Sequence, residues 1–138
     1  MSIPLPQPQP DLIAGPYTDE LAGTEIEYRY SSGRHYRMEF DSGTLAFDHL
    51  NGPAQGVRVG PLPYRARRLR DGQYLVCWTL KEPGVHVTLV VDFAQDRIDV
   101  SAMMPPNRWE FFDAGELLSV TRPQQSRAAT ADGRTARA

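Results

Sequence analysis

The chain has 138 residues, with 15 basic and 17 acidic side chains and a formal net charge of −2. A chain of this length is expected to form one domain, and its weak negative charge excludes the basic field that nucleic-acid binding requires. The single cysteine, Cys77, excludes an internal disulfide, and no apolar run is long enough to span a bilayer. We therefore expect a bacterial-type cytoplasmic protein that binds neither nucleic acid nor a membrane.

The two ends of the chain differ in composition from the middle. Residues 1–16 carry prolines at positions 4, 6, 8, 10 and 16, a spacing that favours an extended arm. Residues 124–138 contain no large apolar side chain, so they cannot bury enough surface to offset their ordering entropy. We predict a proline-rich N-terminal arm at 1–16, a folded domain at 17–122 and a disordered tail at 123–138.

The first part of the folded domain predicts a β-hairpin. Apolar and polar residues alternate along residues 24–30 and 36–40, on either side of a Ser-Ser-Gly turn. Because successive strand residues point to opposite faces, Tyr28, Tyr30 and Tyr36 fall on the apolar face of this hairpin.

The rest of the domain continues with period two. Further strands are expected at residues 45–49, 65–70, 73–80, 85–92, 97–102 and 116–121. An irregular segment rich in glycine and proline leaves room for a short strand at 57–59, and residues 107–115 leave room for one turn of helix.

About eight short antiparallel strands in meander order predict an all-β fold, a small closed barrel rather than a sandwich. The apolar faces carry side chains with polar tips: Tyr28, Tyr30, Tyr36, His49, Tyr74 and Trp78. A purely structural core is usually aliphatic, so this lining predicts a central ligand cavity. The alternative is packing, with each polar tip at the rim of the barrel.

Two motifs carry a resemblance to a known family. The pattern Tyr-x-Tyr-x-x-Gly-x-x-Tyr from Tyr28 to Tyr36 resembles the first hairpin of bacterial phenolic acid decarboxylases, which are lipocalin-like (calycin) barrels. The segment Trp-Thr-Leu-Lys-Glu-Pro from Trp78 resembles their Trp-Thr-Glu-Pro segment with two residues inserted. The layout of Trp78, Glu82 and Asp92 is also similar to MoaF-like proteins, which share that barrel and are named for molybdenum cofactor biosynthesis.

The resemblance implies roles for particular residues. It implies that Tyr28, Tyr30 and an arginine, here Arg58, hold a substrate carboxylate, and that Glu82 takes part in proton transfer. Arg58 is one residue out of step with the family pattern, which turns it to the other face of its strand unless a bulge corrects the register. The insertion before Glu82 keeps its face but moves the side chain by about 6–7 Å.

Tyr28, Tyr30 and Glu82 also form a chemically sensible set without the resemblance. A buried glutamic acid has a raised pKa and can act as an acid near neutral pH, while two tyrosines at i and i+2 can grip one carboxylate. The alternatives are hairpin packing for the tyrosines and a solvated turn for Glu82. His49 is either a cavity base or a core histidine.

We predict a cofactor-independent, decarboxylase-like lyase that acts on a small aromatic or unsaturated carboxylic acid inside the barrel. Its predicted catalytic residues are Tyr28, Tyr30 and Glu82, and its predicted substrate-binding residues are Tyr36, His49, Arg58, Tyr74 and Trp78. No metal is expected, because the three histidines lack paired spacing.

Two alternative functions use the same pocket. One is a non-catalytic lipocalin-like or MoaF-like protein that binds a small hydrophobic ligand, and the other is a natural-product isomerase, cyclase or dehydratase. A homodimer is left open because Trp109, Phe111 and Phe112 could form an exposed apolar surface. These three residues could equally plug one end of the barrel.

Overall fold

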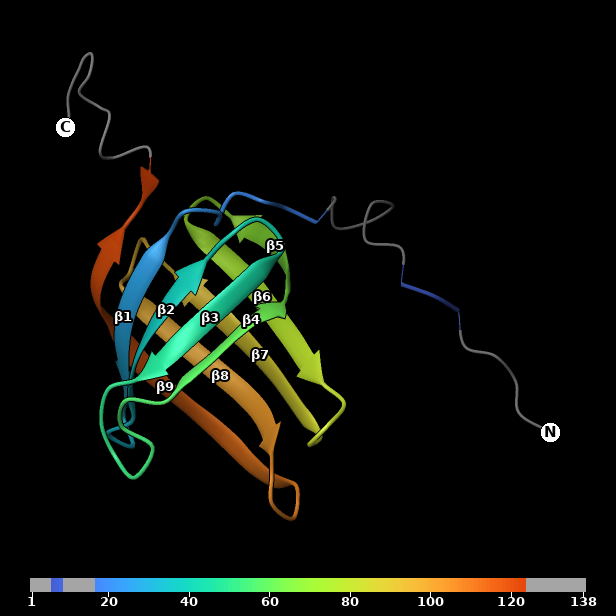
Figure 1. The fold of residues 1–138 in the computed structure, drawn as a ribbon. Coiled ribbons are helices and arrows are strands. Elements are labelled where there is room, and N and C mark those ends of the chain that lie inside the picture. Colours follow the sequence, from blue (N-terminus) through green and yellow to red (C-terminus); the bar gives the residue numbers. More distant parts are fainter. Residues whose placement is uncertain (1–5, 9–16, 124–138) are drawn as a thin grey trace.

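The computed structural model describes residues 6–8 and 17–123. These residues form nine antiparallel strands and no α-helix (Figure 1). The strands are β1 (Glu25–Tyr30), β2 (His35–Phe40), β3 (Thr44–His49), β4 (Arg58–Pro63), β5 (Arg65–Arg70), β6 (Gln73–Leu80), β7 (Val85–Asp92), β8 (Arg97–Met104) and β9 (Trp109–Thr121). The predicted tail at 123–138 and most of the predicted arm at 1–16 lie outside the described residues.

The strands form one sheet that curls into a nearly closed barrel. Their order is β4-β3-β2-β1-β9-β8-β7-β6-β5, so every neighbouring pair except β1 and β9 is also consecutive in the chain. The turns after β1, β3, β6 and β8 lie at one end of the barrel, the lower end in Figure 1. We call this the open end, because the cavity described below is reached from it.

The seam of the barrel lies between β4 and β5. These strands stand at the two ends of the sheet order, yet one residue, Tyr64, joins them in the chain. β4 contains Pro61 and Pro63, and a proline cannot donate to a ladder, so β4 suits an edge position. Tyr64 secures the corner, since its hydroxyl donates a hydrogen bond to the carbonyl of Asp41 at 2.9 Å.

These strands confirm the all-β antiparallel barrel, with one strand more than the expected number. The short strand expected at 57–59 is part of a longer strand, β4, which begins at Arg58, and residues 107–115 are not helical. β9 begins at Trp109 and runs for 13 residues, so the helical turn expected there is wrong. Trp109 and Phe111 have the spacing of two that a strand imposes, and Phe112 follows on the other face of the strand.

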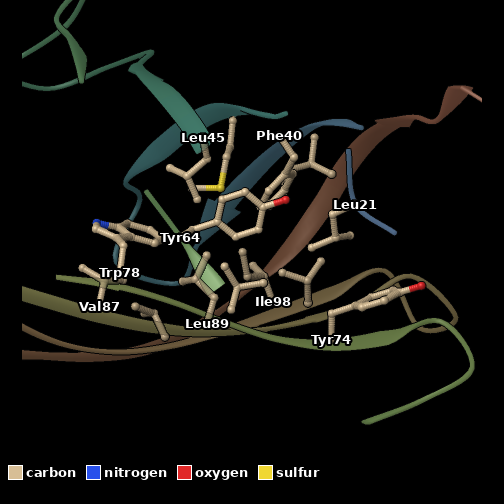
Figure 2. Packing of buried hydrophobic residues seen from close by; sticks show 14 of the residues in the cluster. Leu21, Phe40, Leu45, Tyr64, Tyr74, Trp78, Val87, Leu89 and Ile98 are labelled. Carbon is tan, nitrogen blue, oxygen red and sulfur yellow. The ribbon is translucent and has the colours of Figure 1, made fainter. Parts of the chain in front are cut away.

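The opposite end of the barrel is filled by the hydrophobic core (Figure 2). Leu21, Ile26, Met38, Val76 and Val91 are completely buried. A layer of large side chains covers this end, and its members are Phe40, Tyr64, Tyr74 and Phe93. The aliphatic packing leaves space only toward the open end of the barrel.

In the described parts of the chain, no helix is both long and apolar enough to cross a membrane.

Candidate ligand-binding cavity

A cavity of about 390 Å³ lies inside the barrel at its open end. Its volume falls within the usual range for small-molecule sites. Strands from both halves of the sheet contribute its aromatic wall, which consists of Tyr28, Tyr30, Tyr36, Phe47, Trp78 and Phe111. No aspartate or glutamate lines it among the described residues.

Three tyrosines form one cluster on this wall. Tyr28 and Tyr30 lie two residues apart on β1, so both point inward, and Tyr36 on β2 is the cross-strand partner of Tyr28. The rings of Tyr28 and Tyr36 stack with centroids 5.5 Å apart, and Tyr30 meets both rings edge-on, at 5.5 Å and 6.0 Å. The predicted placement of all three tyrosines on one inner face matches this geometry.

The side chains of Tyr28 and Tyr30 are almost fully buried, and their hydroxyl groups are open to the cavity and have no protein partner among the described residues. The two side chains are 3% and 5% exposed, and neither hydroxyl makes a hydrogen bond to any residue that the structure describes. Burial raises the pKa of both phenols well above the ordinary value. Both groups therefore stay protonated and can donate a hydrogen bond to a molecule in the cavity.

His49 and Trp78 also line the cavity, as predicted from their faces. The His49 ring lies 5.2 Å from the ring of Tyr36. Its Nδ1 lies 2.9 Å from the carbonyl oxygen of Val57, and since a carbonyl only accepts, the proton is on Nδ1. This bond fixes the ring in the wall and leaves Nε2 as its second polar atom.

Arg34 is a cavity residue that the sequence analysis missed. It lies just before β2, at the even position that shares a face with Tyr36 and Met38, and it lines the cavity at the open end. Its Nη1 lies 3.4 Å from the hydroxyl oxygen of Tyr36. The period of two, extended one step back from Tyr36 into the turn, could have identified it.

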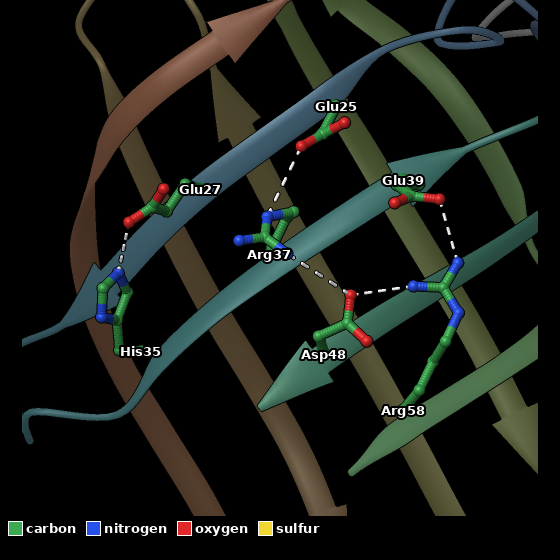
Figure 3. Close-up of polar contacts among 7 residues, drawn as sticks. All are labelled: Glu25, Glu27, His35, Arg37, Glu39, Asp48 and Arg58. Carbon is green, nitrogen blue, oxygen red and sulfur yellow. Dashed lines mark hydrogen bonds and ion pairs between the residues drawn. The ribbon is translucent and has the colours of Figure 1, made fainter. Parts of the chain in front are cut away.

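Arg58 lies outside the cavity, on the outer face of the barrel (Figure 3). Its guanidinium group binds Glu39 at 2.9 Å and Asp48 at 2.8 Å. A bulge does occur in β4, but it falls at Gly60 and Pro61, after Arg58. Because the bulge comes too late, Val59 points into the cavity and Arg58 points away from it. Arg58 therefore does not face a molecule in the cavity, although the resemblance implied that it binds the carboxylate of the substrate.

Tyr74 also lies away from the cavity, at the opposite end of the barrel. Its hydroxyl group donates a hydrogen bond to Glu20 Oε1 at 2.7 Å, and its ring packs against Phe93. The structure therefore places this predicted substrate-binding residue in the covering layer of the core.

Glu82 lies in the exposed turn between β6 and β7. This turn and the turn after β8 enclose a separate surface hollow of about 600 Å³, which Glu82 lines with Lys81 and Arg108. Pro83 and Pro105 line both the hollow and the cavity. Glu82 is thus near the cavity entrance but is not part of the cavity wall. The predicted catalytic set is divided, with Tyr28 and Tyr30 in the cavity and Glu82 outside it.

Trp109, Phe111 and Phe112 divide between two surfaces. Phe111 lines the cavity and packs edge-on against Tyr30 at 5.2 Å. Trp109 stands at the open end, where its Nε1 donates to the carbonyl of Pro105 at 2.9 Å. Phe112 points outward and is 81% exposed. The alternation along β9 therefore makes one of the three a wall residue and another an outer-surface residue.

Within the described ranges, no three His, Cys, Asp or Glu side chains come together in a way that could hold a metal ion. The polar side-chain groups on the cavity wall are phenol hydroxyls, one imidazole, one guanidinium and the indole of Trp78. Such a set can donate hydrogen bonds and can orient an anion or a polar aromatic molecule.

A nearly closed antiparallel barrel with one end packed and the other open to an internal cavity is consistent with the calycin-like superfamily of small barrels. The family model described as MoaF-like matches residues 22–114, and the chain belongs to this MoaF-like family. The match includes the tyrosine cluster, Arg34 and Glu82. No curated protein matches the chain.

Proposed function

We propose that the protein binds a small aromatic molecule inside the barrel. The observation that carries this proposal is the pair of Tyr28 and Tyr30 hydroxyls, which have no protein partner among the described residues and lie on the wall of a cavity of about 390 Å³. Both hydroxyls are open to the cavity, because among the described residues the buried side-chain polar atom without a partner is Thr24 Oγ1. A molecule with a hydrogen-bond acceptor that enters the cavity therefore finds two donors on the wall.

The rest of the wall supports an aromatic occupant. Phe47 on β3 and Trp78 on β6, from the two sides of the seam, lie with ring centroids 5.9 Å apart, and Phe111 adds a third ring. Aromatic side chains offer both large apolar contact and edge-to-face geometry to a ring held among them.

Ligand binding can be tested by calorimetric titration with three probes: trans-cinnamate, its methyl ester and 1-naphthol. The substitution Ala102→Phe places a ring in the cavity, because Ala102 lines it. Ser101→Phe is the matched control, since Ser101 is exposed on the opposite face of the same strand. We expect binding in the wild type and in Ser101→Phe, and none in Ala102→Phe. A wild type that binds none of the probes, or an Ala102→Phe variant that is folded and binds normally, would contradict the proposal.

A second candidate is a cofactor-independent lyase acting on a small aromatic or unsaturated carboxylic acid. What supports it is the grouping of protonated Tyr28 and Tyr30 with His49 on one wall, where proton transfer to or from a bound molecule is feasible. Glu82 stands outside this wall, so any proton it supplied would have to come from the entrance.

The lyase candidate is tested by incubating the protein with p-coumaric, ferulic and caffeic acids and following the loss of cinnamate absorbance. Turnover that is lost in Tyr30→Phe supports a catalytic cavity. Turnover that is also lost in Glu82→Gln assigns a role to the entrance carboxylate. Binding without turnover rejects the lyase for these substrates and leaves the binding protein.

We also propose that the protein forms a homodimer through the outer face of β8 and β9. Phe112 and Met103 are 81% and 48% exposed on this face, and exposed large apolar side chains mark association surfaces when they cluster. Sedimentation of the wild type and of Phe112→Ser tests it: a dimer that dissociates in the variant supports this surface, and a monomeric wild type rejects it.

A further inference from the structure

Arg34 is held at the cavity entrance by contacts that leave its charge unpaired. Its guanidinium carbon lies 5.3 Å from the ring centroid of Trp109 and 5.1 Å from that of Phe111. Contacts of this kind hold a cation by the negative face of an aromatic ring. Together with the Tyr36 hydroxyl 3.4 Å away, they order the guanidinium group before any ligand arrives.

Arg34 and Arg58 differ in whether a carboxylate is bound to the guanidinium group. Arg58 is bonded to two carboxylates, Glu39 and Asp48. Within residues 17–123, no carboxylate oxygen lies within 4.0 Å of Arg34; the arginines paired in this way are Arg29, Arg37, Arg58, Arg68 and Arg97. The guanidinium group of Arg34 is therefore a cation at the cavity with no fixed anion.

The surroundings of the entrance favour an anion. No aspartate or glutamate lines the cavity among the described residues, and the adjoining hollow carries Lys81 and Arg108 against Glu82 alone. Clustered charge of one sign beside low-dielectric walls raises the local concentration of the opposite charge. The entrance thus attracts anionic small molecules, while the deeper wall is aromatic.

We propose that Arg34 is the anion-binding residue of this cavity and that the ligand is a small aromatic or unsaturated carboxylic acid whose carboxylate lies at the entrance. This deepens the proposed function and rests on it. The planar guanidinium group matches a carboxylate through paired N–H donors. The body of the acid then extends inward along the aromatic wall that includes Phe47 and Trp78, and its far end lies toward Tyr28 and Tyr30. This orientation is the reverse of one in which the paired tyrosines hold the carboxylate.

The test compares an acid with its neutral ester in matched arginine variants. Binding of trans-cinnamate and methyl trans-cinnamate is measured by calorimetry at pH 7 in the wild type, Arg34→Gln, Arg34→Lys and Arg58→Gln. Arg34→Gln and Arg58→Gln remove the same charge, one at the cavity and one on the outer face.

We expect Arg34→Gln to weaken cinnamate about 10-fold or more, the usual loss for a hydrogen bond to a charged group, and to leave the ester within about 2-fold. Arg34→Lys should retain part of the affinity for the acid, and Arg58→Gln should retain all of it. An unchanged acid-to-ester ratio in Arg34→Gln overturns the inference, as does an equal loss in Arg34→Gln and Arg58→Gln.

The same data separate this inference from the proposed function. If the ester binds the wild type and the acid shows no dependence on Arg34, the cavity binds aromatic molecules and only the role of Arg34 is rejected. If neither compound nor 1-naphthol binds, both are rejected. Thermal melting of each variant checks that the barrel is intact.

Discussion

Tyr30 on β1 and Gly115 on β9 are cross-strand partners at unusually close approach. A Cβ atom placed on Gly115 would lie 2.7 Å from the Tyr30 Cα atom and would overlap the carbonyl oxygen of Arg29. The pair is part of the ladder that joins β1 and β9, the first and last strands in the chain, in the middle of the sheet. The absence of a side chain at position 115 thus allows the backbones of β1 and β9 to lie this close together.

This contact predicts that Gly115→Ala is strongly destabilising. The clash is with backbone atoms, which cannot rotate away, so we expect a loss of about 2–3 kcal/mol or more in the free energy of unfolding. Gly33→Ala is the control, because nothing lies within 4 Å of its added Cβ and only its φ of +97° opposes the change. For Gly33→Ala we expect about 1 kcal/mol. Urea unfolding of both variants measures the difference, and equal losses would contradict the close-contact explanation.

Tyr28→Phe and Tyr30→Phe should separate binding from stability. Each removes a hydroxyl that has no protein partner among the described residues, so we expect the free energy of unfolding to stay unchanged or rise by up to about 1 kcal/mol. Tyr64→Phe is the matched control, since it breaks the bond to the Asp41 carbonyl and should lose about 1 kcal/mol. Ligand affinity should fall in the first two variants and remain in the third. A marked destabilisation by Tyr28→Phe would indicate a structural role for its hydroxyl.

Alkaline pH should unfold the barrel through the same two phenols. Burial raises the pKa of Tyr28 and Tyr30 in the folded state. Their contribution is therefore complete below the unfolded value of about 10 and is lost as the pH rises above it, by up to about 1.4 kcal/mol per pH unit for each group.

The alkaline prediction is checked by measuring urea unfolding from pH 8 to pH 11.5, with phenolate absorbance at 295 nm followed in parallel. The double variant Tyr28→Phe, Tyr30→Phe should lose less stability over this range than the wild type. Phenolate formation by either tyrosine before unfolding would show that these groups are accessible to water in the folded protein.

Asp113 should stabilise the turn that carries Arg34. Its carboxylate accepts hydrogen bonds from the Ser31 hydroxyl, from the backbone N–H of Ser32 at 3.0 Å and from that of Ala114 at 2.7 Å. The Ser31 bond is the main cause of the lowered pKa of Asp113. Because the folded pKa is depressed, the stabilisation is present above the unfolded value of 3.8 and is lost as the pH falls through the lower folded value.

We expect Asp113→Asn to lose about 1 kcal/mol or less at pH 7, since the carboxylate is near solvent. The difference in melting temperature between wild type and variant should be constant from pH 5 to pH 7 and should shrink below about pH 4. A difference that stays the same at pH 3 would mean that the charge of Asp113 does not matter.

The inward-facing residues of the first hairpin could be predicted from the sequence, because the features that place them lie close together in the chain. Alternation alone places Tyr28, Tyr30 and Tyr36 together, and the Ser-Ser-Gly turn sets the register that pairs Tyr28 with Tyr36. The same reasoning placed His49 and Trp78 toward the interior. The same reasoning would also have placed Arg34 on this face if the alternation had been continued back into the turn.

The positions of Tyr74 and Arg58 could not be predicted from the local sequence pattern. Tyr74 has the inward face that was predicted, but alternation does not say at which end of the barrel a residue lies. That depends on the length of each strand and on the tilt that closes the sheet. The face of Arg58 depended on whether the bulge in β4 came before or after it, and the bulge at Gly60 comes after it.

The sequence by itself determined an antiparallel all-β barrel, its hairpins and the inward set of aromatic residues, because these follow from a period of two and from turn residues a few positions apart. Only the tertiary structure decided which inward residues share the cavity. Pairing of the first and last strands of the chain brought Phe111 of β9 to Tyr30 of β1. The folded barrel also left Glu82 in a turn outside the wall and placed Arg34 at the entrance without an anionic partner among the described residues. These relationships join residues far apart in the chain, so their geometry is set by strand pairing and barrel closure rather than by any local pattern.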